Sequence, residues 1–333
     1  MKMQKQFLYQ LDTKENRVLL INEIDGRRIQ DALISIGSGS NLCRYSYSGY
    51  TLIDYDENLL SSGDFTGTPV LYPTPNRVED GIVHHRGEKF LQEKRGKVVF
   101  EHGLVYDEAW DLDEVVVDDL GVSVRTKIAW HDNKPFFKAF PFLHTLTLSF
   151  RMHKKGLTIS YEIHNLDTVE LPYGFGLHPY FQKISGDKGT MISLPVKNVM
   201  EATEELLPTG KILAVKGTGF DLNDFTPIGD HDLDHVFMRN RNSTPAIIHF
   251  TYQGLKLKIR TSREFLYFVV YSPASSKYFC IESQTCSTNA HNLYDCGLKS
   301  ISGLRFVKPG GFARGYVKFE VSKAHKDENP HVN

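Results

Sequence analysis

Apolar residues alternate with polar ones over most of this chain, from about residue 18 to about residue 321. A period of two puts apolar side chains on one face of a strand and polar ones on the other, so it predicts β-strands. The clearest case is a hairpin with strands at 146–152 and 157–163 and a turn at 153–156, and a second hairpin is predicted over 248–260. The pattern predicts an all-β fold, a large antiparallel β-sandwich with few short helices.

Helical patterns are nearly absent, and the best candidate, Asn292 to Leu298, predicts a short turn at most. The chain contains no internal repeat, low-complexity linker or Pro/Gly/Ser-rich break that would separate two domains. We therefore predict one β-sandwich domain over 1–333, with a loose polar tail at 322–333.

The net charge and the cysteine content limit which partners and which cellular compartment we expect for this protein. The 333 residues include 39 Lys+Arg and 40 Asp+Glu, for a net charge of -1 without a basic cluster, which argues against nucleic acid or an anionic membrane as a partner. Residues 1–20 hold no apolar core of secretory length. The four cysteines form no CxxC pair, which predicts free thiols and a cytoplasmic location. The sequence predicts no oligomeric state.

Motifs for cofactors and metals are missing. Residues 37–40 read Gly-Ser-Gly-Ser, without the third glycine or the strand-helix context of a dinucleotide loop. His231 and His235 are four apart, but the segment has no helical pattern that would place them on one face. We predict that the protein uses no cofactor and no metal.

The segment Tyr173–Phe181 carries the first chemical signal. With period two, Gly174, Gly176 and His178 share one strand face, so the histidine stands beside a face with no side chains. Glycines in a strand often mark a place where a ligand approaches the backbone, and Pro179 favours an extended conformation at the histidine. The segment is equally compatible with a packed core strand, structural glycines and a satisfied core histidine.

The segment Tyr278–Gln284 carries the second signal, with Cys280, Glu282 and Gln284 on one face. Taken alone, Glu282 is more typical of a solvent-facing strand position. A histidine and a glutamate facing one cavity would form an acid and a base. Opening of an aldose ring needs such a pair, because one group takes the proton of the anomeric hydroxyl while the other protonates the ring oxygen.

At residues 176–181 the sequence Gly-Leu-His-Pro-Tyr-Phe resembles the signature of the aldose 1-epimerase, or galactose mutarotase-like, family around its acid histidine. Further blocks resemble the family in order along the chain: Asn76-Arg77, His102-Gly103, Asp234-His235, Glu282 with Asn289–Asn292, and Lys308-Pro309-Gly310. The resemblance implies the galactose mutarotase-like supersandwich fold and mutarotation of a free aldose.

The resemblance also implies roles for single residues. His178 would be the catalytic acid and Glu282 the catalytic base. The family blocks would supply residues that bind the sugar: Asn76, Arg77, His102 and Asp234. Gly176, on the strand face without side chains, would also contact the sugar. Two aromatic residues could stack on the sugar, although aromatic side chains at such densities are more often core: Trp110 and Tyr180.

Two departures suggest a divergent subgroup. The galactose-type members carry Asn-His-Thr-Tyr-Phe where this chain has Leu-His-Pro-Tyr-Phe at 177–181, and Tyr106 stands where many relatives have arginine. Other functions stay open. A phosphosugar 1-epimerase of the same fold would need basic groups such as Arg77, Arg86 and Lys89 around a phosphate. A carbohydrate-binding protein without turnover and a glycoside hydrolase using two carboxylates are further alternatives.

Overall fold

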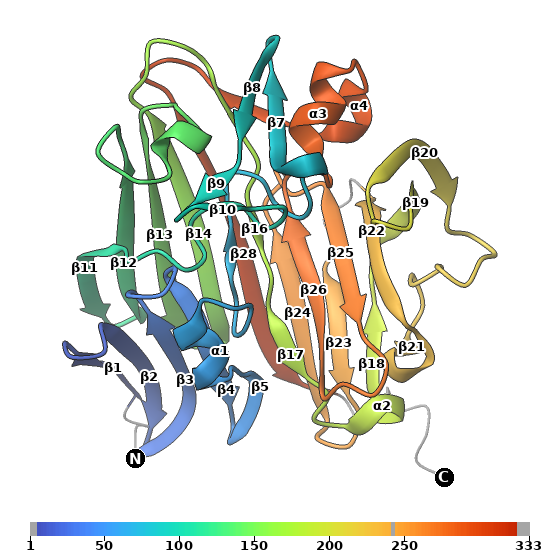
Figure 1. Cartoon of the computed structure of the whole chain (residues 1–333). Coiled ribbons are helices and arrows are strands. Elements are labelled where there is room, and N and C mark those ends of the chain that lie inside the picture. The colour runs from blue at the N-terminus through green and yellow to red at the C-terminus, as the bar shows by residue number, and fades with distance from the viewer. Residues whose placement is uncertain (1–4, 241–243, 325–333) are drawn as a thin grey trace.

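The computed structural model describes residues 5–240 and 244–324. Two large antiparallel sheets lie one behind the other, and short segments at their ends and edges complete the molecule (Figure 1). The sequence-based prediction of an all-β sandwich with few short helices is therefore confirmed.

The first sheet, which has 13 strands, carries the candidate site. Its hydrogen-bonded order is β1 (Lys5–Asp12), β2 (Arg17–Ile24), β3 (Arg27–Ser35), β4 (Asn41–Tyr47), β5 (Tyr50–Ile53), β17 (Tyr180–Gln182), β26 (Tyr278–Gln284), β25 (Tyr267–Ser272), β22 (Leu233–Arg239), β19 (Val196–Ala202) and β20 (Pro208–Ala214). Off this path, β16 (Gly176–Leu177) pairs with both β26 and β6 (Val70–Leu71).

The second sheet has nine strands and backs the first. Its order is β11 (Asp111–Asp118), β12 (Gly121–Trp130), β13 (His144–His153), β14 (Gly156–Asn165), β28 (Phe312–Lys323), β24 (Leu255–Thr261), β23 (Ala246–Phe250), β18 (Thr190–Ser193) and β21 (Thr226–Pro227). Both predicted hairpins are present, as β13–β14 and β23–β24, and buried residues alternate with partly exposed ones along β13 and β14. Within the second hairpin, Tyr252 lies in the turn and is 75% exposed.

The smaller elements cluster at the ends of the sandwich. They are the strand pairs β7 (Ile82–His85) with β8 (Glu88–Leu91), β9 (Glu93–Lys94) with β10 (Lys97–Val98), and β15 (Leu171–Tyr173) with β27 (Arg305–Val307); the helices α1 (Glu57–Ser62), α2 (Gly186–Gly189), α3 (Ala290–Asp295) and α4 (Lys299–Ser302); and the 3-10 turns Glu79–Gly81, Phe137–Ala139 and Ile228–Asp230. Figure 1 shows β7, β8, α3 and α4 gathered at one end. Within the described ranges, no helix has the length and apolar character needed to cross a membrane.

The loose tail was predicted to start at residue 322, which is too early in the chain. Strand β28 runs to Lys323, and both Ser322 and Lys323 pair with β24, because the alternating pattern of the strand continues through Val321. Residues 325–333 of the predicted tail lie outside the described residues.

The core between the two sheets fixes which face of the first sheet carries the site. Phe181 on β17 and Phe279 on β26 are fully buried, and the ring of Phe181 lies 5.8 Å from that of Phe319 on β28 of the second sheet. Because side chains alternate along a strand, Cys280, Glu282 and Gln284 of β26 point away from this core. The candidate site therefore lies on the outer face of the first sheet.

Candidate functional site

His178 and Glu282 face each other across two paired strands. Strand β16 pairs with β26 through Gly176 and Gln284, and β17 continues in the same register two residues beyond His178. This register places His178 opposite Glu282, and His178 Nε2 lies 3.3 Å from Glu282 Oε1. Directly opposed strand residues have neighbouring side chains, so the sheet itself brings these two groups together.

Burial controls the charge of both groups. Both side chains are buried, and Glu282 Oε2 accepts a hydrogen bond of 2.8 Å from Gln284 Nε2. Loss of water lowers the pKa of His178 to about 3 and raises the pKa of Glu282 well above its ordinary value, with the Gln284 hydrogen bond acting in the opposite direction on Glu282. The neutral form of each group is therefore favoured, with the proton that the pair shares resting on Glu282.

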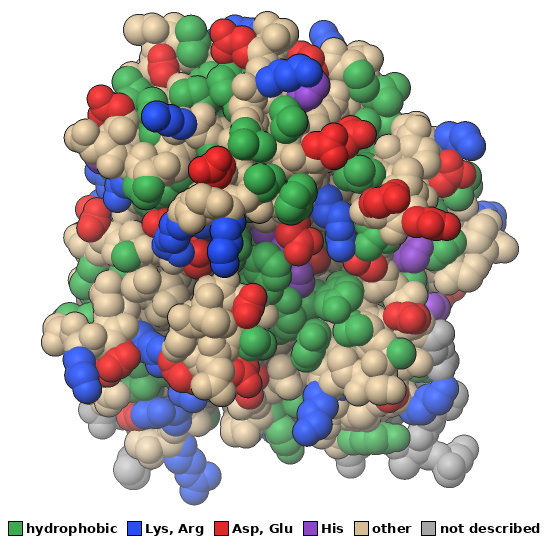
Figure 2. Space-filling model, in the orientation of Figure 1, with side chains coloured by type: hydrophobic (Ala, Val, Ile, Leu, Met, Phe, Trp, Pro, Cys, Tyr) green, Lys and Arg blue, Asp and Glu red, His purple; other side chains and the backbone are tan. Residues whose placement is uncertain are grey.

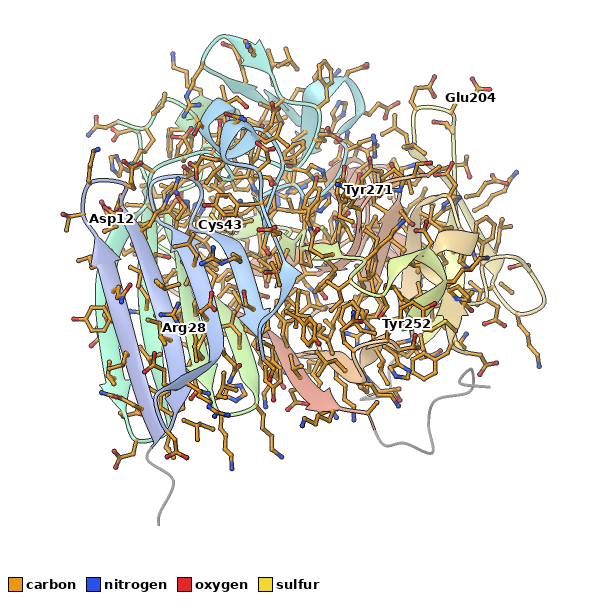
Figure 3. The ribbon with its side chains drawn as sticks, turned by 90° about the horizontal axis from the view of Figure 1, so that it is seen from below. Asp12, Arg28, Cys43, Glu204, Tyr252 and Tyr271 are labelled. Atoms are coloured by element: carbon orange, nitrogen blue, oxygen red, sulfur yellow. The ribbon has the colours of Figure 1, made fainter. Side chains whose placement is uncertain are left out.

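Tyrosine rings support the imidazole of His178. The ring of Tyr180 is nearly parallel to it, with centroids 4.9 Å apart, and Tyr278 packs against Tyr180 at the same centroid distance. Tyr271 stands edge-on to His178 at 6.5 Å, and Figure 3 shows Tyr271 well inside the outline of the molecule. Tyr180, predicted as a stacking platform for a sugar, thus stacks on the histidine itself.

His102 reaches the pair from a loop above the sheet. Its ring stands edge-on to that of His178, with centroids 5.1 Å apart, and the ring of Phe65 also packs edge-on against it at 4.6 Å. The loop turns through left-handed conformations at His102 (φ 63°) and Gly103 (φ 77°), and a Cβ at Gly103 would collide with the carbonyl oxygen of Tyr72. The glycine of the His-Gly pair is therefore required where the loop crosses Tyr72.

Burial, together with the neighbouring His178 and Arg77, lowers the pKa of His102 well below its ordinary value. His102 Nδ1 and His178 Nδ1 are both buried and have no hydrogen-bond partner within the described part of the chain. Two unpaired ring nitrogens at one place indicate a site for a polar ligand, because buried polar atoms are normally hydrogen-bonded.

Arg77 and Asp234 form an ion pair beside the histidines. Arg77 Nη2 lies 3.5 Å from Asp234 Oδ2 and 3.8 Å from Glu101 Oε2, and Asn76 Oδ1 accepts from Arg77 Nη1 at 3.3 Å. Asp234 lies on β22 and is paired with Tyr271 of β25. This register places Asp234 on the same outer face as Glu282.

Helix α3 holds the loop that carries Arg77. Asn289 N donates to the carbonyl oxygen of Arg77 at 2.9 Å, and its Oδ1 accepts from the backbone of Glu79 and from Asn292 Nδ2. Asn292 also joins the backbone of β7 through Ile82 and His84. These two asparagines and Gln284 were not predicted as site residues. For Gln284, the one indication in the sequence was its place on the same strand face as Glu282. For the two asparagines, there was no indication in the sequence beyond the family resemblance.

Two residues predicted to contact the sugar have surroundings other than those expected. Trp110 packs in the main core, where its backbone N donates to Ile36 at the end of β3 and its Nε1 donates to Val105, so its ring belongs to the sandwich interior. A Cβ at Gly176 would lie 3.0 Å from Gln284 Cγ and 3.3 Å from Leu71 Cδ1. We expected open volume for a sugar at Gly176, but the glycine instead leaves space for the packing of β6 and β26.

The structure thus brings together His178, Glu282, His102, Arg77, Asn76, Asp234 and Tyr180 from several separate segments. Figure 2 shows His side chains near the middle of this face, recessed among hydrophobic, acidic and basic ones. The cluster offers an acid and a base in contact, a cation, and several hydrogen-bond acceptors. Such a set suits a small polar molecule that exchanges protons with the pair.

Comparisons with known proteins identify the family and the fold of the chain. The family model described as aldose 1-epimerase matches residues 51–328. An uncharacterized Escherichia coli K12 protein, YihR, is 24% identical over 229 residues, which cover 67% of this chain and 71% of that protein.

Solved structures show the same fold. A galactose mutarotase-like protein from Clostridium acetobutylicum superposes with a TM-score of 0.83 at 22% identity, covering 96% of this chain and 99% of that one. A galactose 1-epimerase from Lactobacillus acidophilus superposes with a TM-score of 0.73 at 17% identity, covering 97% and 100%. At these identities the structural likeness establishes the fold alone.

Proposed function

This chain belongs to the aldose 1-epimerase family, and from that membership we propose that it interconverts the α and β anomers of a free aldose, with His178 and Glu282 as its acid–base pair. The observation that carries the proposal is the 3.3 Å contact between His178 Nε2 and Glu282 Oε1. Positioned proton donors and acceptors of this kind lower the barrier to proton transfer. The proposal involves no cofactor and no metal.

In the proposed reaction, Glu282 takes the proton of the anomeric hydroxyl while His178 gives a proton to the ring oxygen. The bond between the anomeric carbon and the ring oxygen breaks, which leaves an open-chain aldehyde. Rotation about the first carbon–carbon bond presents the other face of the carbonyl. The hydroxyl formed from the ring oxygen then attacks the carbonyl carbon and gives its proton back to His178, while Glu282 gives its proton to the carbonyl oxygen, so atoms and protons balance over the cycle.

The reactive form differs from the form that burial favours in the sugar-free site. The mechanism needs Glu282 ionised and His178 protonated, whereas burial keeps the shared proton on Glu282. The Gln284 hydrogen bond and the nearby Arg77 both lower the pKa of Glu282. Hydroxyl groups of a bound sugar add further hydrogen bonds, and transfer of one proton across the 3.3 Å contact then prepares the pair.

Recognition of the sugar is assigned to the groups around the pair. Arg77 can donate to sugar hydroxyls and Asp234 can accept from them, while the unpaired His102 Nδ1 offers a further contact. Asn76 positions the Arg77 guanidinium through its 3.3 Å hydrogen bond. We place the chain in a divergent subgroup marked by Leu-His-Pro at 177–179.

A phosphorylated sugar is a less suitable substrate for this cluster. Arg77 already faces two carboxylates, those of Asp234 and Glu101. Arg86 is paired with Glu170 at 2.8 Å, in a different cleft beside α3 and α4. A phosphate site needs basic groups that converge on one point, and these two do not.

Polarimetry on freshly dissolved single anomers of several hexoses and pentoses tests the proposal. We expect a rate above the uncatalysed rate for at least one free aldose, and loss of that rate in His178→Asn and in Glu282→Gln. Binding of sugars without any rate enhancement would instead support a carbohydrate-binding protein. Turnover of glucose 6-phosphate but not of glucose would favour the phosphosugar enzyme.

A further inference from the structure

A cavity of about 680 Å³ opens at one end of the sandwich. The last residues of β22 and β24, Arg239 and Thr261, line it together with the loop 262–266 and the first residue of β25, Tyr267. Ser300 of α4 also lines it, so the cavity lies at the end of the molecule where Figure 1 shows α3 and α4.

Strand β22 separates this cavity from the candidate site. Arg239 follows Asp234 by five residues on this strand, a distance of about 17 Å at the usual rise of about 3.4 Å per residue. Side chains alternate along a strand, so Asp234 and Arg239 leave it on opposite faces. The guanidinium carbon of Arg239 lies 4.7 Å from the centre of the Phe268 ring, which is fully buried in the core between the sheets. The cavity is therefore distinct from the place where His178 and Glu282 meet.

Positive charge dominates the lining of this cavity. Four of the lining side chains are basic, Lys197, Arg239, Arg263 and Arg305, and one is acidic, Glu264. Glu264 Oε1 accepts a hydrogen bond from Arg263 Nε at 3.1 Å, so the carboxylate is already paired. No other carboxylate of the described residues lines the cavity, which leaves three positive charges without a counter-charge there. We call it the basic cavity.

Arg239 is the buried member of this set, with 9% of its surface exposed. Its Nη1 donates to Thr261 Oγ1 and to the carbonyl oxygen of Phe265, and Nη2 takes part in neither bond. Its Nε is buried and has no hydrogen-bond partner among the described residues. Burial lowers the pKa of Arg239 to about 10, so the group keeps its charge at neutral pH.

A buried guanidinium normally faces an anion, because a buried charge without a counter-charge costs free energy. Within residues 5–240 and 244–324, no carboxylate forms an ion pair with Arg239, and its contact with the Phe268 ring offsets only part of that cost. The support that Arg239 gives to the loop at Phe265 accounts for Nη1 alone. The unbalanced charge indicates a site for an anion from solution.

We propose that the basic cavity binds a phosphate monoester of a small organic molecule, with the phosphate beside Arg239. A phosphate monoester carries close to two negative charges at neutral pH, which suits three unpaired cations better than a carboxylate does. The guanidinium group also matches the geometry of phosphate oxygens. This inference holds whether or not His178 and Glu282 turn over a sugar.

The size and the apolar part of the lining argue for an organic ester rather than for free phosphate. A volume of about 680 Å³ is typical of pockets that bind small organic molecules, and a phosphate ion would leave most of it empty. Met238 and Leu266, both partly buried in the lining, offer apolar contacts to the organic part. Asn240 and Ser300 add polar groups that can bind hydroxyls.

Isothermal titration calorimetry with phenyl phosphate, inorganic phosphate and benzoate tests the proposal. We expect phenyl phosphate to bind at one site with a Kd below about 1 mM. The other two should bind about tenfold more weakly, because inorganic phosphate lacks the organic part and benzoate lacks the second negative charge. Absence of binding by phenyl phosphate, or equally tight binding of either comparison compound, would overturn the proposal.

Variants assign the binding to the basic cavity. Arg239→Gln should weaken the binding of phenyl phosphate about tenfold or more, because hydrogen bonds to charged groups are strong. Lys197→Glu reverses an exposed charge in the lining without touching the core, so it should weaken binding about threefold even if Arg239→Gln does not fold. Lys216→Glu, at an exposed position outside the lining, is the matched control and should bind as the parent does.

Arg77→Gln separates the basic cavity from the candidate site. We expect this variant to bind phenyl phosphate with the affinity of the parent protein, because Arg77 does not line the basic cavity. Loss of binding in Arg77→Gln would place the ester at the candidate site and refute the proposal. Unchanged affinity in Lys197→Glu, or equal losses in Lys197→Glu and Lys216→Glu, would refute it as well.

Discussion

His178 and Glu282 are two buried titratable groups in contact, and such groups titrate as a unit. Burial alone would leave each of them neutral, whereas the proposed reaction needs one to give a proton while the other takes one. The pair meets both conditions if it holds a single proton that can sit on either residue. The consequences are measurable at the level of single side chains.

Replacement of the pair is expected to be strongly non-additive. Each of His178→Asn and Glu282→Gln should lower kcat by about 10²- to 10⁴-fold, because each removes one partner of a coupled transfer. The double variant should be hardly slower than the slower single variant, as is typical of residues that act together. Polarimetric kcat values for the three variants give the comparison. Fully multiplicative losses would contradict the assignment.

The pH dependence of kcat/KM is expected to show a wide plateau. Activity falls at low pH when the pair gains a second proton, and it falls at high pH when the pair loses its only proton. Burial lowers the pKa of His178 to about 3 and raises the pKa of Glu282, so the two limits move apart. We expect a level profile from about pH 5 to about pH 7.

The variant Gln284→Leu tests the origin of the alkaline limit. It removes the hydrogen bond that lowers the pKa of Glu282, so the fall at high pH should move to still higher pH. A narrow maximum between the ordinary values for glutamate and histidine, 4.5 and 6.5, would indicate that the pair is open to water in the working protein.

At the scale of secondary-structure elements, short pieces of strand and helix place the site residues. Strand β16 has only two residues, yet its pairing with β26 and β6 sets the position of the chain just before His178. Helix α3, with Asn289 at its start, ties the loop of Arg77 to the β7–β8 hairpin. The proposed acid–base pair and the proposed recognition groups thus rely on different elements, and substitutions in those elements should affect different kinetic constants.

Enlargement of Gly176 should act through Gln284. A Cβ there would lie 3.0 Å from Gln284 Cγ and would push on the side chain that holds Glu282. We expect Gly176→Ala to lower kcat by about tenfold, because a catalytic group displaced by a fraction of an ångström loses efficiency. The fold should be retained. Gly219→Ala is the control, since Gly219 has open space around it. Unchanged kcat in Gly176→Ala would show that Gln284 does not position Glu282.

Removal of the α3 clamp should affect binding more than chemistry. Asn292→Ala deletes hydrogen bonds to Ile82, His84 and Asn289, so the loop of Arg77 loses support. We expect KM to rise several-fold with kcat nearly constant, and stability to fall by about 1–3 kcal/mol in chemical denaturation. Asn198→Ala, which removes a partly exposed amide on β19 with a single 3.4 Å hydrogen bond to the Leu213 carbonyl, serves as control. A fall in kcat with KM unchanged would contradict this division.

At the scale of the whole molecule, one core joins the two sheets. Phe319 of β28 in the second sheet is fully buried, and its ring lies 5.8 Å from Phe181 and 6.5 Å from Tyr45, both in the first sheet. Phe319→Ala should cost about 3–5 kcal/mol, the range for loss of a buried phenylalanine. Hydrogen exchange should quicken in both sheets. Tyr316→Ala, at a half-exposed position on the same strand, should change stability by less than about 0.5 kcal/mol. Faster exchange in the second sheet alone would show that the sheets unfold separately.

Much of the fold could be predicted from the sequence, because alternation of side chains is a local property of a strand. The hairpin β13–β14, its turn at 153–156, and the common face of Cys280, Glu282 and Gln284 all follow from this period. The errors lie where a pattern ends. The strand predicted over Tyr173–Phe181 is broken into β15, β16 and β17, and β28 continues into the predicted tail.

The candidate site was harder to predict from the sequence than the fold, because it depends on contacts between distant segments. Periodicity put His178 and Glu282 on faces of two strands, but only the pairing of β16 and β17 with β26 brings them within 3.3 Å. Likewise, aromatic character alone could not place Trp110 in the core and Tyr180 on the histidine ring. The sequence by itself determined which residues could do the chemistry and which face of a strand each occupies. Only the folded molecule decided which groups meet, because pairing joins strands that are far apart in the chain. It also decided where the shared proton rests, because burial of the pair removes water from both groups.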